Sequence, residues 1–180
     1  MTKPSQSGPK VETNLPVEIC LETTDDATEV AALIDHVFGP AIFTRAAHVL
    51  RGDTPSVPQF TFVARSEGAI IGTVRLTPIR WGDRDILMLG PLGVDPSAKN
   101  MGVGRLLMKT VMDAACADEA AAKWGAVMLV GDPPYYKPFG FKPVAHGAFD
   151  APLPVDPMRV LVAALVEGGD AGLRGVARPV

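Results

Sequence analysis

The sequence is poor in features that mark several common protein classes. It has two cysteines, Cys20 and Cys116, which lie far apart and form no CxxC pair, so neither a disulfide framework nor a zinc site is indicated. Two reduced thiols in a cytoplasmic protein are the expectation, with no metal bound. Basic residues are not in excess either, because the formal net charge is −3. That balance argues against broad nucleic-acid binding and leaves room for a local basic patch that binds a small anion.

Long apolar runs are also missing. No uninterrupted stretch reaches the roughly 18 residues that a membrane span needs, and residues 1–16 lack the apolar core of a secretory signal. We therefore expect a soluble cytoplasmic protein with no membrane partner. Apolar residues nevertheless make up 47% of the 180-residue chain, which is enough to fill one substantial core. The length predicts a single domain without internal repeats.

Composition divides the chain into three stretches. Residues 1–15 are polar and rich in proline, serine and lysine, and are expected to be a disordered leader. Residues 16–167 carry the periodic apolar patterns of a domain. Residues 168–180 are rich in glycine and are expected to form a loose tail.

Apolar periodicity and turn residues predict the elements of the domain. Helices are expected at about 26–38, where Asp26 and Glu29 have capping-box spacing, at 43–50, and at 103–121. Strands are expected in 17–22, three times within 59–94, and in 124–132, 141–147 and 157–166. The long helix between two strands implies a crossover, so those two strands should be parallel in a mixed α/β sheet. Gly90-Pro91 should leave the third of the consecutive strands bulged or unpaired on one side.

The stretch "VDPSAKNMGVGRLL", residues 94–107, allows two interpretations. Its glycines let the backbone approach an anion at a helix start, where free amides, the helix dipole, Lys99 and Arg105 favour a pyrophosphate. Alternatively, the glycines serve only the geometry of a strand-to-helix loop. A P-loop is excluded because Arg105 and Leu106 follow Gly104, and a dinucleotide fingerprint is excluded because Leu107 replaces its third glycine.

A different family fits these residues. The stretch resembles motif A of the GNAT acetyltransferase superfamily, Q/R-x-x-G-x-G/A, with Lys99, Gly102 and Gly104 at its defined positions. The preceding "LGPLGV" also resembles the family. So does "VGDPPYYKPFGF", which matches Y-x-x-x-G-F with Tyr136 as its tyrosine. The combination looks like a bacterial branch of N-acetyltransferases, and the resemblance covers about residues 17–150.

The resemblance implies a fold. It is an α/β (α+β) single domain with a mixed, mostly antiparallel sheet of about six or seven strands. The sheet is splayed between its fourth and fifth strands and carries about four helices. The family makes a homodimer plausible.

The resemblance also implies acetyl-CoA as co-substrate. The pyrophosphate would lie on the loop and first helical turn, formed by Lys99, Asn100, Met101, Gly102, Val103, Gly104 and Arg105. Lysine and asparagine stand at the first two of these positions, where the family more often has arginine or glutamine followed by glycine. The pantetheine arm would pair with backbone groups of Leu92, Gly93 and Val94.

Tyr136 stands at the position of the family's general acid, and the alternative is an aromatic side chain that packs beside Phe139 and Phe141. Proton transfer from a phenol of pKa about 10 to a thiol of about 8.5 is uphill by roughly 2 kcal/mol. We expect Tyr135 to be structural or substrate-facing, and Asp132 to cap the helical turn that begins at Pro133.

No general base is evident from the sequence. The fourth strand offers only Asp85, and the histidines are scattered. His146 is the weak choice among the three histidines. The acceptor site should be formed by the first two helices, by the turn at 80–85 around Trp81, and by residues 145–157.

Three functions therefore compete. The first is an N-acetyltransferase that moves the acetyl group of acetyl-CoA to a primary amine of a small molecule or peptide. The second is a non-catalytic acyl-CoA sensor on the same fold, and the third is a protein-interaction domain that binds no CoA.

Overall fold

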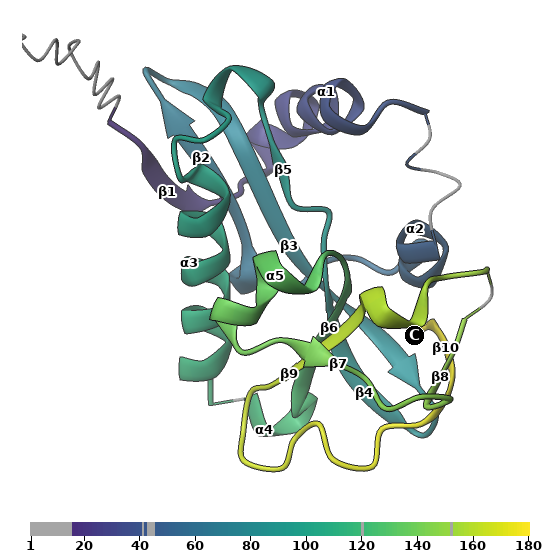
Figure 1. Ribbon diagram of the computed structural model, residues 1–180. Coiled ribbons are helices and arrows are strands. Elements are labelled where there is room, and N and C mark those ends of the chain that lie inside the picture. Colours follow the sequence, from purple (N-terminus) through teal and green to yellow (C-terminus); the bar gives the residue numbers. More distant parts are fainter. Residues whose placement is uncertain (1–15, 41, 43–45, 120, 152) are drawn as a thin grey trace, which may run out of the picture.

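The computed structural model describes residues 16–40, 42, 46–119, 121–151 and 153–180. The expected leader and the first residues of the helix expected at 43–50 lie outside these ranges. The helices are α1 (Ala27–Phe38), α2 (Ala46–Arg51), α3 (Val103–Ala117), α4 (Ala121–Trp124) and α5 (Pro133–Tyr136) (Figure 1). The strands are β1 (Glu18–Leu21), β2 (Thr61–Ser66), β3 (Ala69–Trp81), β4 (Arg84–Leu89), β5 (Gly93–Val94), β6 (Ala126–Val130), β7 (Lys142–Pro143), β8 (Phe149–Asp150), β9 (Val160–Ala164) and β10 (Gly175–Pro179).

The strands form one mixed sheet in the order β1-β2-β3-β4-β6-β9-β7. Neighbours in this order are antiparallel apart from β4 and β6, which are parallel. The chain between those two strands contains α3, so the predicted crossover is confirmed. The expected mixed, mostly antiparallel sheet is likewise confirmed.

Both faces of the sheet are buried, because successive side chains of a strand point to opposite faces. In β2, Phe62 and Ala64 join the core under α3, whereas Val63 between them joins the core under α1. Figure 1 shows α3 along one side of the sheet and α1 and α2 on the other. The buried residues of α3 are Val103, Leu107, Met108, Val111, Met112 and Ala115, and Ala114 is only half-buried.

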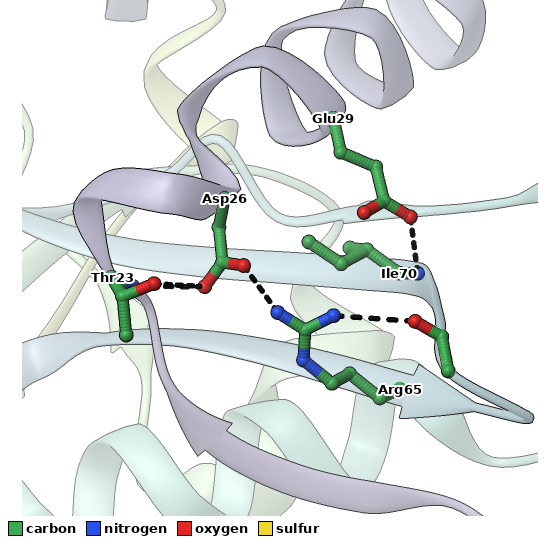
Figure 2. Close-up of polar contacts among 6 residues, drawn as sticks. Thr23, Asp26, Glu29, Arg65 and Ile70 are labelled. Carbon is green, nitrogen blue, oxygen red and sulfur yellow. Dashed lines mark hydrogen bonds and ion pairs between the residues drawn. The ribbon is translucent and has the colours of Figure 1, made fainter.

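Polar contacts fix the start of α1 against the β2–β3 hairpin (Figure 2). Asp26 accepts hydrogen bonds from the amide (2.9 Å) and hydroxyl (3.1 Å) of Thr23 and forms an ion pair with Arg65. Glu29 accepts a 2.7 Å hydrogen bond from the amide of Ile70. The predicted Asp26–Glu29 capping box is therefore wrong. The box joins Thr23 and Asp26, and Glu29 instead binds the strand that α1 covers.

The long helix is shorter than expected. It ends at Ala117, because Asp118 leaves the helical region with φ −71° and ψ 133°, and the separate turn α4 follows. The expected tail also differs from the structure. Residues 175–179 form β10, which pairs antiparallel with β3 and parallel with β8. The second half of β3, beyond its pairing with β2, offers free backbone groups that β10 satisfies, and Ala177 is buried there.

The sheet opens between β4 and β6, as expected. The two strands pair only at Leu87–Val127 and Met88–Met128. After Leu89 the chain follows β3 with the register shifted by one residue, so that Thr73 faces Gly93. This shift is the bulge predicted around Gly90-Pro91. Beyond it β5 pairs with β3 while β6 pairs with β9, and the two strands separate.

Candidate active site

A cavity of about 860 Å³ occupies the opening between the diverging strands. One wall comes from the bulge and β5, including Leu92 and Val94, and the other from residues 129–132 after β6. Tyr135 and Tyr136 of α5 line it as well, together with residues of α2 and of the segment 154–159. The splay thus places a pocket where two sheet strands each present an unpaired edge.

The start of α3 presents free backbone donors. Asn100 (φ 66°) and Gly102 (φ 80°) adopt left-handed conformations that turn the chain into the helix. No described residue accepts a hydrogen bond from the amides of Gly102–Arg105. The amide of Met101, which was expected to belong to this set, donates instead to the carbonyl of Ala98 (3.3 Å).

The other residues of the loop have different surroundings. Lys99, Asn100 and Arg105 are exposed, whereas the side chain of Val103 is buried in the core. Arg105 also lines a separate cavity of about 590 Å³ between α3 and the turn at 138–140. The loop therefore combines two exposed cations with the helix N-terminus, which itself favours anions.

Residues 92–94 present backbone on one edge only. Gly93 and Val94 pair with Thr73 and Gly72 of β3, and no described strand pairs with the other edge of β5. Gly93 is buried, and a Cβ built on it would lie 3.2 Å from Cδ1 of Ile34 in α1. The free edge of this segment borders the cavity.

Tyr136 packs tightly into the wall of the cavity. Its ring contacts Phe141 edge-on at 6.0 Å between centroids. Burial, followed by the neighbouring Tyr135 and Asp132, raises the pKa of Tyr136 to about 12 against a smaller opposing effect of Arg159. The hydroxyl therefore keeps its proton throughout the neutral range, so it can donate a proton but cannot act as a base.

Tyr135 connects the cavity to the start of α3. Its ring lines the cavity, and a Cβ built on Gly104 would lie 2.7 Å from its hydroxyl oxygen. Burial raises the pKa of the Tyr135 phenol, and Arg105 partly offsets the shift. The motif's second glycine and the first tyrosine of "YY" thus lie in contact, although 31 positions separate them in the sequence.

Comparison with known proteins identifies the family. A family model described as an acetyltransferase (GNAT) domain matches residues 58–143. YhbS of Escherichia coli K12, named as an uncharacterized N-acetyltransferase, is 31% identical over 131 residues, which are 71% of this chain and 75% of that protein. The chain belongs to the GNAT acetyltransferase family.

Matches to further GNAT proteins support the same family and fold. YjhQ of Escherichia coli K12, also named as an N-acetyltransferase, is 29% identical over 140 residues, which are 72% of each chain. The crystal structure of YhbS in complex with CoA matches with a TM-score of 0.75 at 25% identity, over 96% of this chain and 94% of that one. A GNAT acetyltransferase of Brucella melitensis in complex with acetyl-CoA matches with a TM-score of 0.52 at 24% identity, over 83% and 96% of the chains, which supports the fold.

Sequence reasoning missed several polar residues of this GNAT cavity. Asp132, expected to cap α5 through its side chain, makes no such bond and instead pairs with Arg159 (3.3 Å). His48 and Arg51 of α2 line the cavity, but no motif marks them. Their position depends on how α2 packs against the sheet, which the sequence pattern does not reveal.

Two of the segments expected to form the acceptor site differ in their position. Residues 154–156 of the expected segment 145–157 line the first cavity. His146 of the same segment, and Trp81 of the expected turn at 80–85, line a different cavity of about 480 Å³. Trp81 is buried, and its indole nitrogen donates to the carbonyl of Ala148 (3.2 Å). Asp85 forms a bidentate pair with Arg80, with a longer arm of 3.0 Å. No described group of histidine, cysteine or acidic residues could hold a metal ion, and no described helix is long and apolar enough to cross a membrane.

Proposed function

We propose that this GNAT protein transfers the acetyl group of acetyl-CoA to a primary amine of a small molecule or peptide by direct attack. The observation that carries the proposal is the contact between Gly104 and the Tyr135 hydroxyl. Through it, a helix start with free amides adjoins the same cavity that Tyr136 lines. An anion-binding site and a proton donor thus border one pocket. The CoA complex of YhbS supports the assignment.

In this proposal the amides of Gly102, Val103, Gly104 and Arg105 bind the pyrophosphate, because no described residue accepts a hydrogen bond from them and they lie at the positive end of the helix dipole. Lys99 and Arg105 add charge around the loop. Asn100 and Met101 shape the turn, since the Met101 amide is already bonded. The free edge of Leu92, Gly93 and Val94 pairs with the amides of the pantetheine arm, as an added strand would.

Transfer requires one bond to form and one to break. The amine nitrogen attacks the thioester carbonyl carbon, and the carbon–sulfur bond then breaks as Tyr136 donates its proton to the departing sulfur. Because the pKa of Tyr136 is about 12, proton transfer from it to a thiolate whose conjugate acid has a pKa of about 8.5 is uphill by about 5 kcal/mol. This cost is larger than the sequence suggested, and it still fits within an enzymatic barrier.

The attacking amine must also release a proton. We propose His48 as its first acceptor, directly or through water, because it is the histidine that lines the cavity. The sequence offered two other candidates for this role. Asp85 is paired with Arg80, and His146 lies at a different cavity.

Calorimetric titration with acetyl-CoA tests the binding half of the proposal. We expect saturable 1:1 binding in the micromolar range. A protein-interaction domain would show no binding and no thermal stabilisation at millimolar acetyl-CoA. An acyl-CoA sensor would bind but release no free thiol with any amine, whereas the proposed enzyme releases CoA in proportion to acetylated amine.

We further propose a cytoplasmic homodimer. Support for the homodimer comes from the family. Support for the cytoplasm comes from Cys116, which is exposed, and Cys20, which is half-buried, because neither forms a disulfide. Sedimentation at several concentrations and fractionation of the source cells test the two statements separately.

A further inference from the structure

A second cavity of about 620 Å³ meets the first at the opening of the sheet. It lies on the α1 side and is lined by α1, the end of α2, the segment 52–56 and β3. The two cavities share Ile42, His48, Arg51, Gly90 and Pro91. An acceptor entering through the second cavity would reach the bulge from the side opposite to the start of α3. We refer to this second cavity as the acceptor cavity.

Among the described residues that line the acceptor cavity, the acidic ones are Glu22 and the exposed Asp35 of α1, and one guanidinium, that of Arg51, has no counterion. Arg75 is neutralised by Glu22 through two hydrogen bonds of 2.9 and 3.2 Å. The guanidinium of Arg51, by contrast, makes no ion pair or hydrogen bond with any residue that the structure describes. Its Nη1 atom lies 3.5 Å from where a Cβ on Gly90 would be, directly at the bulge.

The surroundings of Arg51 are unfavourable for its charge. Burial, and to a lesser extent the nearby charge of Arg75, lower the pKa of Arg51 to about 10. Half-buried charges are ordinarily paired, because desolvation is compensated only by an opposite charge or by hydrogen bonds. A guanidinium also presents a planar fork that matches a carboxylate in a bidentate pair. Arg51 therefore lacks, among the described residues, the counterion that its burial calls for, and a bound anion would supply it.

We propose that the acceptor amine carries a carboxylate, and that this carboxylate binds Arg51 in the acceptor cavity. The inference rests on the proposed acetyltransferase function and names its substrate class. A monoanion fits better than a phosphate, because Arg51 offers one unpaired positive charge and Glu22 already occupies Arg75. Bound in this way, the substrate directs its amine toward Gly90-Pro91, where the two cavities meet.

The test uses a set of α-, β- and ω-amino acids, their primary amides, and aminoalkylphosphonates of matching length. Binding to the CoA-loaded protein is measured by calorimetry, and turnover by thiol release. The proteins are the wild type, Arg51→Gln, Arg51→Lys and the control Arg178→Gln, which removes an exposed arginine of β10.

For the wild type we expect at least one amino acid to exceed its amide by about 10- to 100-fold in kcat/KM, as a charge-assisted hydrogen-bonded pair provides. Arg51→Gln should bring this ratio close to one. It should raise KM for the amino acid and leave kcat/KM for the amide unchanged. Arg51→Lys should restore part of it, and Arg178→Gln should match the wild type.

Four outcomes would overturn the inference. They are a wild type that binds no amino acid better than its amide, a ratio that persists in Arg51→Gln, an equal loss for amino acid and amide, and a preference for the phosphonate. Equal loss would place Arg51 in the chemical step instead of in acceptor recognition. Acetyl-CoA affinity is measured on the same proteins. If the wild type fails to bind acetyl-CoA, the proposed function itself fails, whereas normal affinity with no carboxylate preference rejects the carboxylate alone.

Discussion

Gly131 lies directly beneath the ring of Tyr136. A Cβ built on Gly131 would lie 2.2 Å from Cε2 and 2.9 Å from Cδ2 of that ring. No side chain fits between them, so the glycine after β6 sets how deeply the tyrosine enters the wall of the cavity. The position of the proposed acid thus depends on a residue five positions earlier.

Gly131→Ala should therefore displace Tyr136 and reduce kcat by about 100-fold, the order of loss that a misplacement of 1 Å can cause. Acetyl-CoA affinity should change much less. In a Tyr136→Ala background, the same substitution should cause little additional loss, because the ring it would meet is gone. Equal losses in both backgrounds would show that Gly131 acts independently of Tyr136.

Tyr136→Phe should lower kcat by about 100- to 10,000-fold, the usual contribution of a general acid. Tyr135→Phe is the matched control and should cost much less. Because the pKa of Tyr136 is raised to about 12, its proton is present at every pH below that value. The ratio of wild-type to Tyr136→Phe rates should thus stay constant from about pH 6 to pH 10. Unchanged turnover across this range would reject the assignment.

Gly104→Ala separates two roles of the motif's second glycine. The new Cβ would lie 2.7 Å from the Tyr135 hydroxyl but 3.9 Å from its Cζ. Combining it with Tyr135→Phe should therefore restore the melting temperature. Acetyl-CoA affinity should stay at least about 10-fold weaker in the double variant, if the pyrophosphate needs close approach to the helix start. Full recovery of affinity would mean that the glycine serves only the tyrosine contact.

Asp26 should make the stability of the fold depend on pH in the acidic range. The hydrogen bond from the Thr23 amide lowers the pKa of Asp26 below its ordinary value of 3.8, and Arg65 adds to this effect. A lowered pKa stabilises the fold above the ordinary value, and this contribution is lost as pH falls through the lowered one. Asp26→Asn should thus lower the melting temperature by several degrees at pH 7, with a smaller difference near pH 3.

Asp113→Asn is the control for Asp26, because Asp113 pairs with Lys109 on the exposed face of α3. Exposed ion pairs contribute little to the free energy of unfolding. The melting temperature of Asp113→Asn should therefore stay close to that of the wild type at both pH values. A difference for Asp26→Asn that is the same at pH 3 and pH 7 would contradict the account.

The parts of the fold that follow from apolar periodicity were predictable. β2, β3, β4 and β6 each bury alternate residues on opposite faces, and the bulge follows from a proline that cannot join the ladder. β10 was missed because it contributes mainly backbone hydrogen bonds to β3, which leave no periodic signal in its five residues. α3 was predicted too long because Asp118 ends it without a glycine or proline.

The candidate site also contains residues that could be predicted from the sequence and residues that could not. The loop from Lys99 to Arg105 and Tyr136 carry local motifs, so the sequence indicated them. The roles proposed for Arg51 and His48 depend on the placement of a six-residue helix beside the bulge, and the pairing of Asp132 with Arg159 joins residues from α5 and the segment before β9. Such relationships arise from tertiary packing and have no spacing that a sequence pattern records.

A crystal structure of the acetyl-CoA complex tests the central claim most directly. The account predicts pyrophosphate oxygens within hydrogen-bond distance of the Gly102–Arg105 amides, and the thioester in the cavity between β5 and β6, beside Tyr136. A complex whose pyrophosphate leaves these amides unbonded, or whose thioester lies outside that cavity, would contradict it.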